Sequence, residues 1–206
     1  TGRLGLVELR GFEMPPHEQM SLAQLLLIRS CVAAFWQQPY DRPIQHWGTR
    51  LHDQFLLPHF AWQDLTQLVG ELNAKGSPIS ADWFAVHHEF RFPLIGEMVL
   101  DGMRVELRSA IEPWYVMGEE PGSSGTTRFV DSSLERLQVL VEGLEPDRHA
   151  LIVAGREVPL HATGVAGQYV AGIRYRAWQP PRCLHPTIGV HTPLQFDLVN
   201  RAARRS

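Results

Sequence analysis

The spacing of apolar residues changes near residue 85, and this change constrains the fold of the 206-residue chain more than any other feature. Before residue 85 the apolar side chains recur at helical spacing. After it they alternate with polar ones in short runs separated by turn residues. Helices and strands segregated in this way are typical of α+β proteins. We therefore expect an N-terminal strand with helices over residues 1–84 and an antiparallel β-sandwich domain over residues 85–206.

In the first part, a strand is expected over residues 3–13, followed by two helices. Residues 20–38 are strong helix formers with apolar side chains on most faces, a pattern that predicts a buried helix. Residues 62–74 have apolar side chains at helical spacing and predict a second helix, and Lys75-Gly76 predicts its C-terminal cap. A polar alternation over residues 89–92 is expected to begin the strands of the second part.

In the second part, short alternating runs predict at least seven strands. Asp101-Gly102 predicts a tight hairpin, because both positions of such a turn favour Gly, Asn or Asp. Ala154-Gly155-Arg156, between the runs at residues 151–153 and 157–160, predicts another hairpin. Residues 121–125 are rich in Gly and Ser and predict a loop. Asp131-Ser132-Ser133 predicts a turn or a cap.

Composition excludes several classes of function. The chain has 19 basic and 22 acidic residues, for a net charge of −3, which argues against nucleic-acid binding. Its apolar runs, such as residues 25–28, are far shorter than a membrane span, so no membrane partner is expected. Two distant cysteines imply no disulfide framework, and we expect a reducing, cytoplasmic compartment.

The tetrapeptide Val-Glu-Leu-Arg occurs twice, at residues 7–10 and 105–108. In a strand it places the carboxylate and the guanidinium on one face, where they can bind a cation and phosphate oxygens. A plain surface ion pair is the alternative interpretation, and the second copy shows how readily the pattern arises in strands. The first copy differs because it runs through Gly11-Phe12-Glu13 and two prolines directly into the first helix.

This order of residues resembles the end of the catalytic region of glutamine synthetase-like carboxylate–amine ligases, where a Glu-x-Arg strand and an acidic residue precede an Ala/Leu-rich helix. The Asn-Pro-Tyr of glutamine synthetase itself is absent here. Longer stretches are similar to bacterial proteins called putative amidoligases, which are often named transglutaminase-like. These stretches are RGFEMPPHEQMSLAQLLLIR, LHDQFLLPHFAWQDL, HHEFRFPLIGEM, RFVDSSLERLQV and YRAWQPPRCLHPTIGVH.

The resemblance implies roles for three residues: Glu8 as a metal ligand, Arg10 as a catalytic residue that binds phosphate, and Glu13 as a catalytic residue at the family's following acidic position. It implies ATP and Mg²⁺ as cofactors of a parent ligase that joins a carboxylate to an amine, on a peptide or peptide-like substrate. Because this chemistry needs several carboxylates and the chain offers one such strand, we expect a fragment of a multidomain protein. The fragment is expected to bind no cofactor tightly, to be inactive alone and to have the rest of the parent chain as its partner.

Other interpretations remain open. The chain is alternatively a non-catalytic accessory or binding module, or a carbohydrate-binding sandwich if two aromatic rings lie exposed in one plane. His87-His88-Glu89 is the densest cluster of possible metal ligands, but adjacent histidines in a strand face opposite ways. Cys183 and His185 would share a face if extended, although their Pro-rich surroundings predict a turn rather than a nucleophile.

Overall fold

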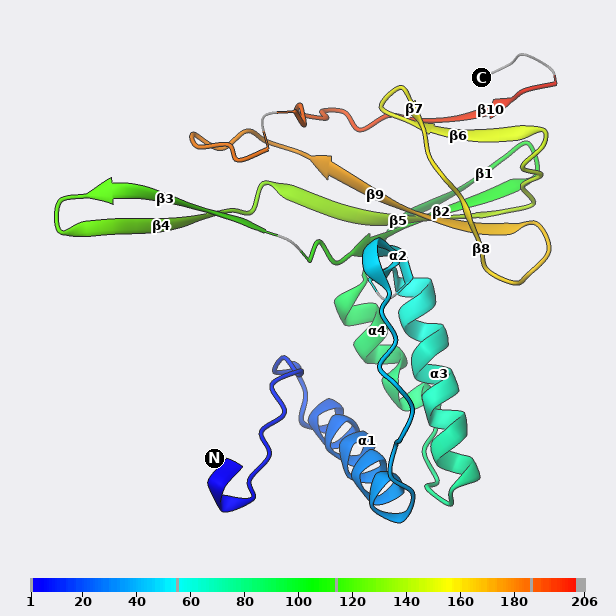
Figure 1. The fold of residues 1–206 in the computed structure, drawn as a ribbon. Coiled ribbons are helices and arrows are strands. Elements are labelled where there is room, and N and C mark those ends of the chain that lie inside the picture. The colour runs from blue at the N-terminus through cyan, green and yellow to red at the C-terminus, as the bar shows by residue number, and fades with distance from the viewer. Residues whose placement is uncertain (1, 55, 114, 186, 203–206) are drawn as a thin grey trace. The chain divides into compact units, whose positions relative to one another are not determined.

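A computed structural model describes residues 2–54, 56–113, 115–185 and 187–202 (Figure 1). Its helices are the 3-10 turns η1 (Gly2–Leu4), η2 (Gly48–Arg50) and η3 (Ala81–Phe84), and the α-helices α1 (Glu18–Gln37), α2 (Leu51–Gln54), α3 (Pro58–Ala74) and α4 (Ala85–Arg91). Its strands are β1 (Leu94–Leu100), β2 (Met103–Ala110), β3 (Val116–Gly122), β4 (Gly125–Asp131), β5 (Leu134–Glu142), β6 (His149–Val153), β7 (Arg156–Glu157), β8 (His161–Ala162), β9 (Gln168–Arg176) and β10 (Phe196–Asn200). This order confirms the α+β class.

The chain forms two compact units. The first contains Thr1–His46 and Gln63–Phe90, and the second contains Trp47–Trp62 and Arg91–Ser206. The second unit therefore includes a segment that precedes all the strands in the sequence. The division into domains at residue 84/85 stays a prediction.

Antiparallel sheets build the second unit (Figure 1). The five-stranded sheet has the order β1-β2-β5-β9-β8 and the three-stranded sheet the order β10-β6-β7, while β3 and β4 form a separate hairpin. The central strand β5 pairs with β9 along its whole length, from Leu134 opposite Arg176 to Glu142 opposite Gln168. The two larger sheets enclose one core, which confirms the expected sandwich.

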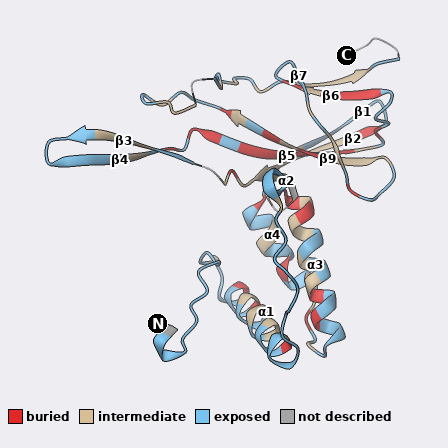
Figure 2. Ribbon diagram, viewed as in Figure 1, coloured by how far each residue is buried: buried red, intermediate tan, exposed pale blue. Residues whose placement is uncertain are grey.

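The period-two pattern of β5 explains where this core lies. Leu137, Val139 and Val141 point into the sandwich and are buried, together with Leu151 and Val153 of β6. Figure 2 shows buried residues along β5, β6 and β9. At about 25 cal/mol for each square ångström of apolar surface removed from water, this packing is the main stabilisation of the unit.

Turn chemistry sets the hairpins. Both predicted hairpins are confirmed, and both turn through left-handed residues: Asp101 and Gly102 have φ values of 49° and 79°, and Ala154 and Gly155 have 48° and 75°. The Gly/Ser loop expected at residues 121–125 is instead the tip of a hairpin, in which Gly122 of β3 pairs with Gly125 of β4. Strand pairing therefore continues up to the two residues of the turn itself, 123 and 124.

Both ends of α3 follow from local sequence. Gly76 has a φ of 91°, its N–H donates to the Asn73 carbonyl at 2.9 Å, and the N–H of Ser77 donates to the Leu72 carbonyl at 3.0 Å. This pair of bonds is a Schellman motif, and it confirms the C-terminal cap predicted at Lys75-Gly76. At the other end, α3 starts earlier than expected, at Pro58, a residue suited to the first helical position.

Two expected strands are wrong. Residues 6–15 have no regular structure, because no described strand lies beside them to take their backbone hydrogen bonds. Residues 89–91 belong to α4, because Ser80 caps the preceding turn through the Asp82 N–H at 3.2 Å and η3 continues directly into the helix. A four-residue alternation is too short to distinguish the two periods.

The predicted burial of the first helix is also wrong. Only Met20, Ala23 and Ala34 of α1 are buried, and its large apolar side chains are mostly exposed (Figure 2). In the described part of the chain, α1 alone is long and apolar enough to cross a membrane, a test that core helices of soluble proteins also pass. Its composition predicts burial, but no described element of the first unit covers its remaining faces.

We expect Val139→Ala to lower the free energy of unfolding by about 2 kcal/mol, because it leaves a cavity in a fully buried position. The matched control Val130→Ala removes the same methyl groups from a side chain that is 53% exposed and should change stability by less than about 0.5 kcal/mol. Urea unfolding of both variants measures the difference. Equal losses would contradict the placement of the core.

Candidate functional site

Glu8 and Arg10 form an ion pair with two hydrogen bonds in the irregular segment before α1. Arg10 Nε donates to Glu8 Oε1 at 2.7 Å, and Arg10 Nη2 donates to Glu8 Oε2 at 3.0 Å. The side chains are 82% exposed for Arg10 and 56% exposed for Glu8. Such an open pair adds little stability. It leaves a carboxylate and a guanidinium accessible to a ligand, and the similarly exposed Glu13 lies three residues further along.

The second copy of the tetrapeptide is different because it lies in a paired strand. In β2, Val105 and Leu107 pack against the sandwich core, and Glu106 and Arg108 project from the opposite face. Arg108 Nε donates to Glu106 Oε1 at 2.8 Å, and the two side chains are only 18% and 13% exposed.

Neighbouring charges hold this second pair in place. Arg104 Nη2 donates to Glu97 at 2.8 Å and to Glu106 at 3.1 Å, and its Nη1 donates to Glu142 at 3.3 Å. The same tetrapeptide thus contributes a Glu and an Arg to a network of ion pairs in β2, but forms an isolated, exposed ion pair at residues 7–10. Of the two copies, only the first is free to meet a ligand.

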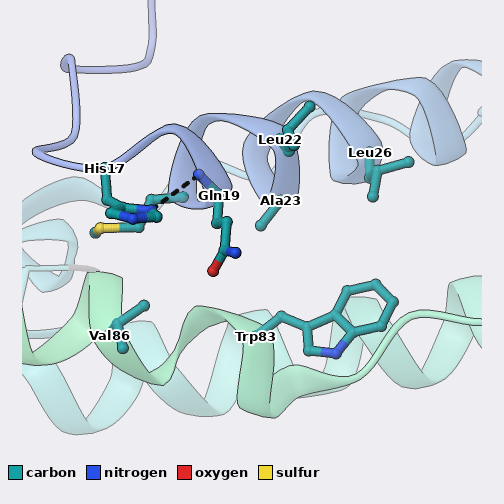
Figure 3. Close-up of a pocket in the computed structure, with 8 residues that line it drawn as sticks. His17, Gln19, Leu22, Ala23, Leu26, Trp83 and Val86 are labelled. Carbon is teal, nitrogen blue, oxygen red and sulfur yellow. Dashed lines mark hydrogen bonds between the residues drawn. The ribbon is translucent and has the colours of Figure 1, made fainter.

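An apolar groove of about 510 Å³ lies in the first unit, beside the start of α1 (Figure 3). Its lining residues are His17, Gln19, Met20, Leu22, Ala23, Leu26, Trp83 and Val86. His17 Nδ1 accepts a hydrogen bond from the Gln19 N–H at 3.2 Å and so caps α1. With so few polar groups, the groove suits an apolar side chain rather than a phosphate.

A group of charged residues around the two buried side chains of Glu112 and Arg136, which we call the Arg136 cluster, comprises Asp53, Glu112, Arg136, His161 and Arg174. Arg136 is 8% exposed; its Nη2 donates to Asp53 Oδ1, and its Nη1 lies 3.9 Å from Glu112 Oε2. Asp53 Oδ2 lies 3.0 Å from His161 Nε2. Arg174 donates to both oxygens of Glu112 at 2.7 and 3.0 Å. These charges neutralise one another, so the cluster is a structural network.

The Arg136 cluster fastens residues 47–62 to the face of the sheet that points away from the sandwich core. Gly172 of β9 makes room for it: a Cβ there would lie 2.7 Å from Arg136 Nη2 and 2.8 Å from Asp53 Oδ1. Leu57 and Phe60 pack on Val170 beside it, and the His59 N–H donates to Gln138 Oε1 at 2.9 Å. Burial lowers the pKa of His59, which keeps its ring neutral.

Asp131 anchors the loop that contains Cys183. Its carboxylate accepts hydrogen bonds from the Ser133 N–H at 3.0 Å, the Ser133 hydroxyl at 2.5 Å and the Leu184 N–H at 2.8 Å. The Ser133 bonds confirm the expected turn. Buried Arg176 donates to the His185 carbonyl at 3.0 Å. These contacts give the segment a structural explanation and provide no base for a nucleophilic Cys183.

The histidines form no metal centre in the described residues, where no three His, Cys, Asp or Glu side chains converge. His87 and His88 lie in α4 rather than in a strand. His87 Nε2 lies 3.0 Å from the Met20 carbonyl oxygen, as expected for a packed structural histidine.

Sequence reasoning found the Glu8–Arg10 pair but missed the Arg136 cluster. Asp53 and Arg136 are 83 residues apart, and no local pattern connects them. Gly172 inside a strand was the one available signal, because a glycine there marks a close approach of other atoms.

Fold and site together define an α+β protein with an exposed Glu–Arg pair ahead of its first long helix. A family model described as "Putative amidoligase enzyme (DUF2126)" matches residues 1–206, and the chain belongs to this family. No curated protein and no solved structure shows significant similarity to it.

We expect Gly172→Ala to destabilise the second unit by about 1–3 kcal/mol, because the added Cβ forces Arg136 and Asp53 apart. Gly96→Ala is the control, because a Cβ on that strand glycine meets nothing within 4 Å. Hydrogen exchange should show faster exchange of the amides of residues 47–62 in Gly172→Ala alone. Unchanged exchange would contradict the fastening role of the cluster.

Stability at acid pH should depend on Asp131. Burial raises the pKa of its carboxyl, but the hydrogen bonds from Ser133 and Leu184 and the charge of Arg176 outweigh burial and lower the pKa to about 2. This value lies below that of an unfolded Asp, so the stabilisation is complete above roughly pH 4 and is lost as the pH falls toward 2.

Urea unfolding at a series of pH values checks this expectation with Asp131→Asn. The variant should be less stable than the parent at neutral pH, and the two stability curves should converge toward pH 2. A constant difference across this range would show that ionised Asp131 is not the cause.

Proposed function

We propose that the protein contributes Glu8 and Arg10 to an ATP- and Mg²⁺-dependent reaction that joins a carboxylate to an amine. The observation that carries this proposal is the exposure of the first Glu–Arg pair, in contrast to the engaged pair of β2. Membership of the amidoligase family supports the reaction class. A peptide or peptide-like substrate is part of the same proposal.

The donor set fits these cofactors. Mg²⁺ is held in proteins by one or two carboxylates together with waters and substrate phosphates, so Glu8 suits the protein's share of such a site. Arg10 uses Nε and Nη2 on Glu8, and its Nη1 is not engaged in those bonds. A guanidinium open to solvent on that side suits phosphate oxygens.

When bound, ATP would supply the phosphoryl group that activates the carboxylate substrate, and Mg²⁺ would neutralise part of the charge of the phosphates. Arg10 would hold phosphate oxygens through its guanidinium N–H groups and so would stabilise the negative charge of the transferred group. Glu8 orients the guanidinium through two hydrogen bonds and offers its oxygens to the cation. Glu13, in the same exposed segment, adds a second carboxylate to this end of the site.

The 206 residues alone are proposed to be inactive, with further ligands supplied by the remainder of a longer, cytoplasmic parent protein. This is supported by the described residues, which bring no three metal-binding side chains together. The alternative function is a non-catalytic accessory module. The exposed Glu8–Arg10 pair is compatible with it, because ordinary protein surfaces also carry solvent-facing ion pairs.

We expect Glu8→Gln and Arg10→Ala in the full-length protein to lower amine-dependent ATP turnover about a hundredfold or more, because each removes a group that acts on the phosphoryl transfer. The matched controls are Glu106→Gln and Arg108→Ala in the second copy, which should keep their turnover per folded molecule. ADP release in the presence of amine and carboxylate substrates is the measurement.

Full turnover in both Glu8→Gln and Arg10→Ala would remove the site and favour the accessory module. Amine-dependent ADP release by the 206-residue chain alone would instead contradict only its proposed inactivity. Circular dichroism of each variant separates a loss of chemistry from a loss of fold.

A further inference from the structure

The strand β1 is an open edge of the five-stranded sheet. It pairs with β2 on one side, and no described strand pairs with it on the other. Its apolar side chains are unusually exposed for a strand, with Ile95 at 57%, Met98 at 55% and Val99 at 71%. An exposed, apolar sheet edge is a template for another strand.

The segment at residues 6–12 also lacks a strand partner and exposes apolar side chains. It carries no strand pairing, and its apolar side chains are exposed, among them Leu6 at 59%, Val7 at 86% and Leu9 at 56%. Figure 1 shows it as an open trace that precedes α1. A segment with this alternation would bury its apolar face on joining a sheet.

The sequence of this segment is one that β1 already accepts. The second Val-Glu-Leu-Arg lies in β2 and pairs antiparallel with β1, with Val105 opposite Met98 and Glu106 opposite Glu97. The two glutamates face each other there because Arg104 donates to both. The other edge of β1 has no described strand to supply such an arginine.

We propose that the free edge of β1 in one copy of this protein pairs antiparallel with residues 6–12 of a second copy. The occupant is a second copy because residues 7–10 repeat the sequence with which β1 already pairs in β2, and neither the edge nor the segment has a described strand partner of its own. Charge sets the register. The alignment used by β2 would place Glu8 against Glu97, whereas a shift of two residues places Arg10 opposite Glu97.

In this register Leu9 lies opposite Met98 and Val7 opposite Leu100, on the face that continues the sandwich core through Val105 and Met103. Glu8 and Arg10 lie on the other, open face of the sheet, so the pairing does not bury them. Exchange of the two segments between copies gives a closed dimer with twofold symmetry.

Sedimentation equilibrium of the 206-residue chain tests the association directly, without ATP. We expect a dimer that Met98→Lys weakens about tenfold or more, because each cross-strand contact occurs twice. The matched control Met117→Lys changes an exposed methionine in β3 and should leave the dimer intact. Arg10→Glu and Glu97→Arg should each weaken the dimer, and the double variant should restore it.

A disulfide trap tests the register. In chains with the half-buried Cys31 and Cys183 replaced by Ser, Leu9→Cys and Met98→Cys proteins should form a cross-linked dimer only when mixed. A chain that stays monomeric at all concentrations, or a mixture without the cross-link, would overturn the proposal. A chain carrying both cysteines that closes only on itself would also overturn it, by showing that the segment pairs within one copy.

Discussion

The buried guanidinium of Arg136 is the constraint on which the arrangement of the second unit depends. A charge with 8% exposure is tolerated only when carboxylates lie against it, because an unpaired buried charge costs several kcal/mol. Asp53 and Glu112 meet this need, and Asp53 brings residues 47–62 back onto the sheet. The glycine at position 172 follows from the same requirement, because a side chain there would occupy the space of the ion pair.

Apolar contacts then secure what the charges position. Leu57 and Phe60 close over Val170 on this face, while the opposite face of the same strands forms the sandwich core. The five-stranded sheet is thus covered on both sides in its middle and on neither side at β1. This uneven cover explains why β5 is largely buried and why the edge strand displays its apolar residues.

Local signals in the sequence predicted local features. The hairpin at Asp101-Gly102, the cap at Gly76 and the alternation of β5 each depend on residues close together in the chain, and each was confirmed. The strand expected near residue 8 failed for a different reason, because strand formation depends on a neighbour. The same tetrapeptide forms a strand in β2, where neighbouring strands pair with it, and is irregular at residues 7–10, where none does. Strand formation here therefore depends on a pairing partner as well as on sequence.

The candidate site shows the same limit. The two-residue spacing predicted that Glu8 and Arg10 would meet, and they do so even without a strand. Their roles in catalysis come from the resemblance and from family membership, because spacing alone also describes the structural pair in β2. The Arg136 cluster could not be predicted from the sequence, because its residues are spread between positions 53 and 174 and no local pattern connects them.

The inclusion of Trp47–Trp62 in the second unit has a practical consequence for dissecting the protein. A polypeptide starting at residue 85 would contain every strand but lack Asp53 and Leu57. Arg136 would then lose one of its two carboxylates, and Val170 would be uncovered. Such an excised sandwich would be prone to aggregate, and the smallest soluble version of this unit has to carry the earlier segment, supplied as a fused or separate peptide.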